Sequence, residues 1–212
     1  MSTSAFLNLG TLPATFFRAG SDCYRIYKYR GSDGQIRTPW YFSSSGDAAP
    51  GRFDLPTPKG TCYLNTRKFG AWQEKFRSSN CVARSDVDGM RLLTAKRVSD
   101  PLRLANLAST RAFAHGITLD LFSGNDFSAS QGLAFEVMRL GFRGVITLAR
   151  HDTSALAKNI ALFGSHGARK KPQGWREDIG ELTSDFGLVT ELSQHGIAVI
   201  EIPHNIPVTP VL

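Results

Sequence analysis

The stretch TCYLNTRKFGAWQE, residues 61–74, changes its pattern halfway along. Its first five residues predict a short strand, and the chain from 67 to 79 predicts a helix. Phe69, Trp72 and Phe76 recur at helical spacing and form one apolar stripe on that helix. Glu74 falls on roughly the opposite side, so this carboxylate faces either solvent or a cleft. Tyr63 lies eleven residues upstream on the adjoining strand.

The rest of the chain alternates irregularly between short strands and helices. Strands are predicted at 22–30, 61–65, 90–98, 144–149, 159–164 and 197–202, and helices at 67–79, 128–140 and within 181–196. Residues 38–60 hold many Gly, Pro, Ser and Asp and predict a long loop. A capping box of Ser128 and Gln131 is expected to begin the middle helix, and Gly141 to end it. This arrangement favours an α+β fold, a mixed and mostly antiparallel sheet with flanking helices, over a doubly wound parallel fold.

Composition indicates an ordinary globular protein that prefers anionic partners. The 212 residues fit one domain, with 42% hydrophobic and 20% charged residues and a net charge of +7. A basic chain attracts nucleic acid or a phosphorylated small molecule. Its densest basic cluster is Arg169, Lys170, Lys171 and Arg176, and the surrounding Gly and Pro predict a solvated loop there.

Several common site chemistries lack their motifs in this sequence. The three cysteines are far apart and the histidines lack metal-ligand spacing, so neither a disulfide framework nor a metal is expected. The chain contains no P-loop, dinucleotide-binding glycine motif, zinc-protease motif or serine-hydrolase elbow. The N-terminal stretch does not resemble a signal peptide, and no apolar run is long enough to span a bilayer. We therefore expect a cytoplasmic protein without membrane contact.

Five candidate site residues lie in short sequence patterns that follow one another along the chain. Arg25 lies in the aromatic strand CYRIY, and Arg52 in a glycine–arginine–aromatic triplet, GRF. Tyr63 and Glu74 follow, eleven residues apart, and Ser128 begins the segment SASQ. Each feature alone has a simpler explanation, namely an edge-strand arginine, a solvated glutamate or a helix cap. The ordered set, continued by GFRGV at 141–145 and IALFG at 160–164, resembles the RES-domain family over roughly residues 20–165.

Two positions depart from the family pattern. Ile26 stands where some members carry a tyrosine directly after the arginine, although Tyr24 and Tyr27 flank it. The strand of GFRGV ends in Ala149, where other members end in Ser-Arg. The family serine is therefore placed at Ser128, with Ser130 as the alternative. The resemblance implies a single RES-like domain over 1–212, with a C-terminal helix and strand at about 180–203 packed on its core.

The resemblance also implies a fold similar to ADP-ribosyltransferases and an NAD⁺-degrading toxin of a toxin–antitoxin pair. NAD⁺ would be the substrate, and its nicotinamide–ribose bond would be cleaved with water or phosphate as the acceptor. Glu74 would stabilise the cationic ribose, and Arg25 and Arg52 would pair with phosphate groups. Tyr63 would stack on a base, and Ser128 would donate to the amide or to a phosphate.

Alternatives from other classes stay open at this stage. The same site could transfer ADP-ribose to a protein target. The basic charge also suits a nucleic-acid-binding module, although direct nucleic-acid binding is not the expectation here because the basic residues are scattered. A third reading is an inactive domain that binds only a partner. The implied partner is a helix-turn-helix antitoxin, with a homo-oligomer as a further arrangement.

Overall fold

The computed structural model describes residues 9–76, 80–118, 120–149 and 156–201 of the chain. Eight strands build one large sheet: Ala14–Phe17 (β1), Asp22–Lys28 (β2), Lys59–Asn65 (β4), Met90–Arg97 (β6), Leu102–Asn106 (β7), Gly144–Leu148 (β8), Lys158–Ser165 (β9) and Trp175–Glu181 (β11). Their order across the sheet is β1-β7-β8-β9-β4-β2-β6-β11. Two small sheets pair Tyr41–Phe42 (β3) with Gly167–Ala168 (β10), and Cys81–Ala83 (β5) with Ala198–Ile200 (β12).

Five α-helices accompany these strands in the described part of the chain. They are Lys68–Phe76 (α1), Arg84–Val87 (α2), Asp120–Ser123 (α3), Ser128–Arg139 (α4) and Phe186–Gln194 (α5), and short 3₁₀ turns cover Leu9–Thr11, Thr110–His115 and Leu182–Ser184. Within the large sheet every pairing is antiparallel except that of β7 with β8. The predicted α+β fold with a mixed, mostly antiparallel sheet is therefore confirmed. Along the described ranges, no helix is both long and apolar enough to cross a bilayer.

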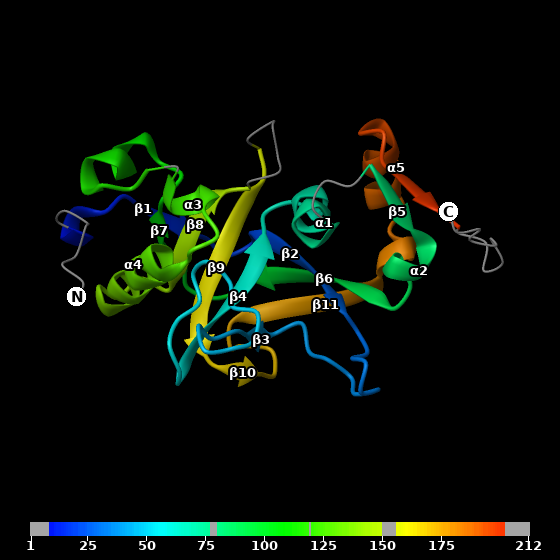
Figure 1. Ribbon diagram of the computed structural model, residues 1–212, viewed down its shortest axis with the longest axis horizontal. Helices are drawn as coiled ribbons and strands as arrows, with labels where there is room; N and C mark the ends of the chain where they lie inside the picture. The colour runs from blue at the N-terminus through cyan, green and yellow to red at the C-terminus, as the bar shows by residue number, and fades with distance from the viewer. Residues whose placement is uncertain (1–8, 77–79, 119, 150–155, 202–212) are drawn as a thin grey trace, which may run out of the picture.

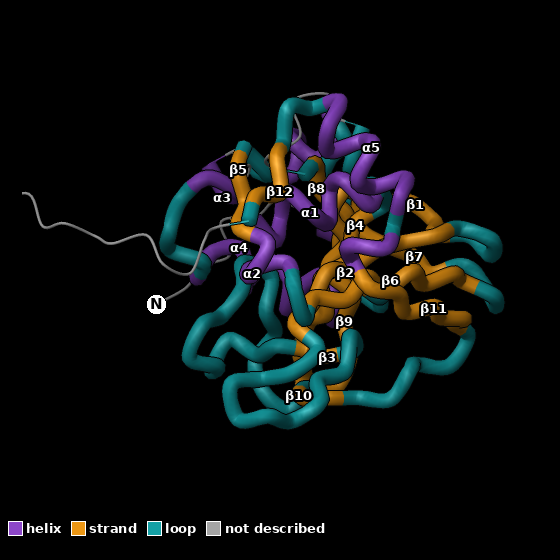
Figure 2. Tube along the Cα trace, turned by 90° about the vertical axis from the view of Figure 1, so that its right-hand side faces the viewer, coloured by secondary structure: helices purple, strands orange, loops and turns teal. Residues whose placement is uncertain are grey.

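The two faces of the large sheet carry different layers. Helices α1, α4 and α5 lie on one face, and the β3–β10 pair lies on the other (Figures 1 and 2). The alternation along the central strands explains this division, because successive side chains of a strand point to opposite faces. In β4, Cys62 and Leu64 join the core on the β3 side, whereas Tyr63 packs on the helix side.

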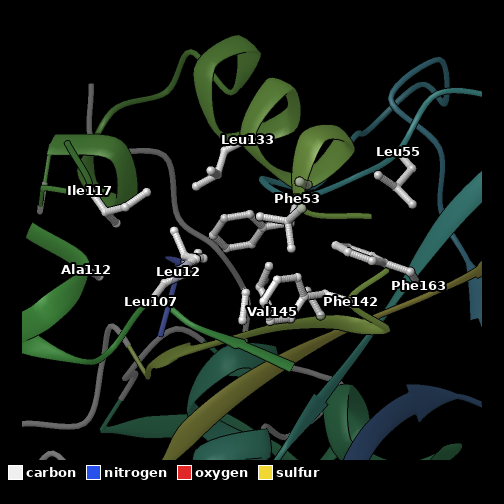
Figure 3. Packing of buried hydrophobic residues seen from close by; sticks show 14 residues of the cluster. Leu12, Phe53, Leu55, Leu107, Ala112, Ile117, Leu133, Phe142, Val145 and Phe163 are labelled. Atoms are coloured by element: carbon white, nitrogen blue, oxygen red, sulfur yellow. The ribbon is translucent and has the colours of Figure 1, made fainter. Parts of the chain in front are cut away.

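The helix side of the sheet contains two separate apolar clusters. One lies beneath α4, where Leu133 faces Phe142 and Val145 with Phe53 between them (Figure 3). The other lies between α1 and α5 and includes Trp72 and Leu188. Each helix thus covers its own part of the sheet, and the strand junction between them is the place where the layer is interrupted.

That junction is the pairing of β2 with β4. These strands share a single register pair, Tyr24 with Asn65, whereas β2–β6 and β4–β9 each pair over seven residues. The sheet therefore opens between β2 and β4 as the two strands diverge. Backbone groups along the opening are not covered by a neighbouring strand, which leaves room for a ligand or for inserted side chains.

Several local predictions need correction. The predicted loop containing Arg176 contributes strand β11, one edge of the sheet, and β1 forms the other edge. The helix predicted within 181–196 begins at Phe186, because Asp185 caps it by accepting from Leu188 N. The strand predicted at 197–202 is confirmed over Ala198–Ile200, where it pairs with β5 outside the large sheet.

Candidate active site

A pocket occupies the opening between β2 and β4, with α1 above it. Its volume is about 240 Å³, and its lining comprises Tyr24, Arg25, Ile26, Tyr63, Leu64, Asn65, Ala71, Glu74, Lys75 and Asn159. Cavities that enclose a drug-sized ligand run to about 300–1,000 Å³, so a dinucleotide would be enclosed here only in part. Three of the five residues singled out from the sequence, Arg25, Tyr63 and Glu74, line this one pocket.

Glu74 reaches the pocket because of the position of α1 on the sheet. Phe69 and Trp72 of the apolar stripe are buried against α5, which turns the opposite side of the helix toward β4 and β9. Glu74 is exposed at the pocket wall, and its Oε1 accepts a hydrogen bond of 2.6 Å from Nδ2 of Asn159. Of the two surroundings that periodicity left open, the structure places this carboxylate at a cleft.

Arg25 is held at the pocket by one nitrogen of its guanidinium. Nη1 donates to the carbonyl oxygens of Pro39 at 2.8 Å and Tyr41 at 3.1 Å, and it lies 2.8 Å from Sγ of Cys62. Burial raises the pKa of the Cys62 thiol, although the charge of Arg25 opposes that rise. Cys62 is thus a neutral acceptor, and the arginine is fixed across the opening between the two strands.

Tyr63 joins the pocket to the loop that contains GRF. Its hydroxyl donates to Oδ1 of Asp54 at 2.8 Å and accepts from the backbone N–H of Phe53 at 2.8 Å. Asp54 is fully buried and also accepts from Gly51 N at 2.6 Å and from the Ser43 hydroxyl at 2.9 Å. A buried carboxylate needs such donors, because an unpaired charge in the interior is costly. Burial and the Asp54 charge raise the pKa of Tyr63 well above its ordinary value.

Arg52 extends from the same loop but does not line the pocket. Its guanidinium donates to the carbonyl oxygens of Leu121 at 3.1 Å and Gly124 at 2.9 Å. The guanidinium also lies 4.5 Å from the ring centre of Phe127. Ser128 follows Phe127 directly, so Arg52 lies at the start of α4.

The start of α4 differs from the expected capping box. Phe127 is the N-cap residue and makes no side-chain cap, whereas the amide of Gln131 donates to the carbonyl of Gly51 at 3.0 Å. The box fails because the Gln131 side chain ties the helix to the GRF loop instead. The backbone N–H of Ser128 donates to Oδ1 of Asp126 at 2.9 Å, and this bond lowers the pKa of Asp126.

The two serine candidates have different surroundings. Ser128 is exposed, whereas Ser130 is 1% exposed and its hydroxyl donates to the carbonyl of Phe127 at 3.0 Å. A ligand could reach Ser128 but not Ser130, which favours the first placement.

Four polar lining residues were not singled out by sequence reasoning as site residues: Tyr24, Asn65, Lys75 and Asn159. Asn65 and Asn159 are register partners on β4 and β9, and a hydrogen bond of 2.6 Å joins their amides. Their position could have been noticed in the sequence, because Asn65 and Asn159 are polar residues near the ends of two largely apolar strands. Lys75 is adjacent to Glu74 on α1, and it places a positive charge beside the carboxylate.

Metal binding has no support among the residues that the structure describes. No group of three or more His, Cys, Asp or Glu side chains there could hold a metal ion. The pocket itself offers one carboxylate, two cations and amides, a donor set suited to an organic anion with hydroxyl groups.

Comparison with known proteins gives one similarity, and it concerns the fold. A chain of the M. tuberculosis MbcT–MbcA toxin–antitoxin complex superimposes with a TM-score of 0.54 at 19% sequence identity, covering 84% of this chain and 92% of that chain. At this identity the likeness shows a shared fold. No model of a known protein family matches the sequence, and no curated protein matches it.

Proposed function

We propose that this chain is the toxin of a toxin–antitoxin pair and that it degrades NAD⁺ by cleaving the nicotinamide–ribose bond. The observation that carries the proposal is the pocket between β2 and β4, in which Glu74 and Arg25 face one ligand volume beside Tyr63. The RES-domain resemblance selects these same residues for NAD⁺ chemistry. The fold shared with a chain of a toxin–antitoxin complex agrees with the proposal.

The reaction requires little from the protein in the way of acid catalysis. The C1″–N bond breaks with its electron pair moving to the positively charged nicotinamide ring, which leaves as a neutral molecule. The ribose carbon becomes oxocarbenium-like and then accepts an oxygen. Attack by water releases one proton and gives ADP-ribose, whereas attack by phosphate gives ADP-ribose 1″-phosphate. The protein has to orient the substrate and stabilise the developing positive charge.

The pocket residues suit these tasks. The carboxylate of Glu74 would stabilise the cationic ribose and hold its hydroxyl groups. Arg25 presents a planar guanidinium that matches phosphate oxygens, and its Nη1 is already anchored to Pro39 and Tyr41. The ring of Tyr63 forms a pocket wall on which a base would stack. Arg52 and Ser128, outside the pocket, would meet the part of the dinucleotide that extends beyond it.

The proposed partner is an antitoxin with a helix-turn-helix domain. It would restrain the toxin by covering the pocket, since NAD⁺ is present wherever the chain is made. We accordingly propose that the protein acts in the cytoplasm, where both its substrate and such a partner are found.

The test is incubation of the purified protein with NAD⁺, with and without phosphate, followed by mass spectrometry of the products. We expect free nicotinamide in both reactions, and ADP-ribose or its 1″-phosphate according to the acceptor. Glu74→Gln should lower the turnover number by about 100-fold or more, because it removes charge stabilisation of the transition state. Glu136→Gln is the matched control, since Glu136 lies on α4 and pairs only with the surface residue Arg139 among the ion pairs described.

Two outcomes would count against the proposal. Intact NAD⁺ after prolonged incubation of folded protein would remove the activity altogether. Equal turnover by Glu74→Gln and the wild type would leave the activity but reject this pocket as its site. Addition of an acceptor protein to the same assay would show whether ADP-ribose is transferred to protein rather than released.

A further inference from the structure

The carboxylate of Glu74 is the last member of a chain of side-chain hydrogen bonds. Nδ2 of Asn65 donates to Oδ1 of Asn159 at 2.6 Å, and Nδ2 of Asn159 donates to Oε1 of Glu74 at 2.6 Å. The first member is anchored in turn, because Oδ1 of Asn65 accepts the backbone N–H of Arg67 at 2.8 Å. The series of hydrogen bonds therefore runs from the turn before α1, across β4 and β9, and back to the second turn of α1.

Both ends of this chain fix the direction of every bond in it. A backbone N–H can only donate, so the Asn65 atom that faces Arg67 is the oxygen and its nitrogen faces Asn159. An ionised carboxylate can only accept, so the Asn159 atom that faces Glu74 is the nitrogen. The two requirements agree, which assigns the orientation of both amides from hydrogen-bonding logic rather than from shape.

The surroundings hold the chain in place. Asn65 is 2% exposed, and a side-chain carbon added at Gly70 of α1 would collide with its amide. Helix α1 therefore packs directly on Asn65, and Asn65 and Asn159 are partners in the β4–β9 ladder. Hydrogen-bonded amides in series polarise one another, which strengthens each bond, and Asn65 anchors the series in the interior. The position of Glu74 relative to the sheet is thus set by two strands as well as by its own helix.

We propose that Asn159 is a positioning residue for Glu74 and that Asn65 orients Asn159, an inference that rests on the proposed function of the pocket. The bond from Asn159 occupies Oε1 and stops rotation of the carboxylate. The other oxygen, Oε2, is then presented to the substrate in one fixed direction. Transition-state stabilisation depends on such preorganisation, because an unrestrained carboxylate would have to reorient during the reaction.

Three substitutions separate this role from simple packing. Asn159→Ala removes the donor, and Asn159→Asp keeps the shape but presents only acceptors to Glu74. Asn65→Asp still accepts from Arg67 but no longer donates to Asn159. A hydrogen bond to a charged group is strong enough that we expect the turnover number of each variant to fall by about 10- to 100-fold. KM should change by less than about threefold, since substrate binding is retained while stabilisation of the transition state is lost.

The matched control is Thr66→Ala. The hydroxyl of Thr66 accepts from the backbone N–H of Lys158 at 2.9 Å, at the same β4–β9 junction but away from Glu74. Its loss should lower stability without changing the turnover number. Turnover of Asn159→Asp within about threefold of the wild type would overturn the proposal, because this variant removes the donor and places a second negative charge beside Glu74.

A second measurement does not depend on catalysis. In the folded protein, the side-chain NH₂ resonances of Asn159 should move on Glu74→Gln and on Asn65→Asp, and they should stay in place on Thr66→Ala. Unchanged Asn159 resonances in Glu74→Gln would contradict the hydrogen bond between Asn159 and Glu74, even in an active enzyme. If the wild type leaves NAD⁺ intact, the proposed function fails. The resonances still decide whether the hydrogen bonds from Asn65 to Asn159 and from Asn159 to Glu74 are formed.

Discussion

The hydroxyl of Tyr63 donates to the buried carboxylate of Asp54 over 2.8 Å, and this bond couples the pocket to the GRF loop. The same hydroxyl accepts the backbone N–H of Phe53, whose ring is inserted into the core beneath α4 (Figure 3). Tyr63 therefore has two tasks, because its ring forms a pocket wall while its hydroxyl fixes the loop that carries Arg52. The two tasks can be separated by removing the hydroxyl alone.

Tyr63→Phe should destabilise the protein by about 1–3 kcal/mol, since Asp54 loses a donor in the interior. Ligand binding by the ring should survive, so KM for NAD⁺ should change little. Urea unfolding at pH 7 measures the first effect. Tyr41→Phe is the control, because its hydroxyl bonds to Asp47 at 3.1 Å on an exposed part of the surface. Equal losses in the two variants would contradict the role of the buried carboxylate.

The Tyr63 hydroxyl also predicts a dependence on alkaline pH. Burial first, and then the charge of Asp54, raises the pKa of Tyr63 well above its ordinary 10.0. The folded state thus holds this proton more tightly than the unfolded state, so stability is complete below pH 10 and falls as pH rises through the folded pKa. Tyr63→Phe should lose less stability than the wild type between pH 9 and 11, as unfolding at several pH values would show.

Gly51 should not tolerate even one methyl group. A side-chain carbon there would lie 2.5 Å from the Tyr63 hydroxyl oxygen and 2.8 Å from the ring carbon Cζ. Gly51→Ala should therefore cost about 1–3 kcal/mol and displace the loop. Gly132→Ala is an instructive control, because nothing lies within 4 Å of the added carbon and the residue is inside α4. That variant should gain about 0.5–1 kcal/mol, so the two substitutions should shift the urea midpoint in opposite directions.

The sequence predicted the central strands because their patterns reflect burial on two faces. Cys23 and Tyr27 of β2 enter one core and Ile26 enters the other, as alternation requires. The edge strand β11 was missed for the same reason. Its sequence, WREDIGE, buries only Trp175 and leaves its remaining side chains partly or fully in solvent, so the apolar alternation that indicates a strand is absent.

Only part of the candidate site could be predicted from the sequence. Helical periodicity predicted that Glu74 lies opposite the apolar stripe, and the ordered motifs indicated Arg25 and Tyr63 as site residues. Nothing local indicated that β2 and β4 would separate after one register pair, since strand pairing depends on residues far apart in the chain. Asn159 lies 85 residues from Glu74, so their hydrogen bond could not be read from spacing.

The ion pair of Lys68 with Asp185 should make the attachment of α5 sensitive to acid. These atoms lie 2.5 Å apart, and Asp185 also caps α5 through Leu188 N. Burial opposes ionisation, but the bonds from Lys68 and Leu188 outweigh it and lower the pKa of Asp185 below its ordinary 3.8. A lowered pKa means that this stabilisation is complete above about pH 4 and is lost as pH falls through the folded value.

Asp185→Ala should lose about 1–2 kcal/mol at pH 7, because the cap and the ion pair both disappear. Asp185→Asn should lose less, since asparagine caps nearly as well. Urea unfolding at pH 7 and at pH 3 should show the difference between Asp185→Asn and the wild type narrowing at the lower pH. Asp88→Asn, in an exposed pair with Arg84, should change stability by less than about 0.5 kcal/mol. A difference for Asp185→Asn that is as large at pH 3 as at pH 7 would contradict the ionic origin.

Lys75 completes a group of cations around the pocket. Although it is an exposed residue, removal of water around its ammonium lowers its pKa, and the charges of Arg25 and Lys28 lower it further. These three like charges repel one another until an anion neutralises them. A ligand that carries a diphosphate supplies that neutralisation, so the charge of Lys75 should favour binding rather than the chemical step.

Lys75→Gln should therefore raise KM for NAD⁺ by about fivefold at low salt, as expected for about 1 kcal/mol between solvated charges in water, and leave the turnover number almost unchanged. In the wild type, KM should begin to rise at a pH below 10.5, the ordinary pKa of lysine. The pKa of Lys75 is lowered, so its charge is lost at a lower pH. That alkaline rise should be weaker in Lys75→Gln. Lys170→Gln removes the same charge from an exposed loop and is the control. Identical KM values and salt dependence for the two variants would show that net charge, not the position of Lys75, governs binding.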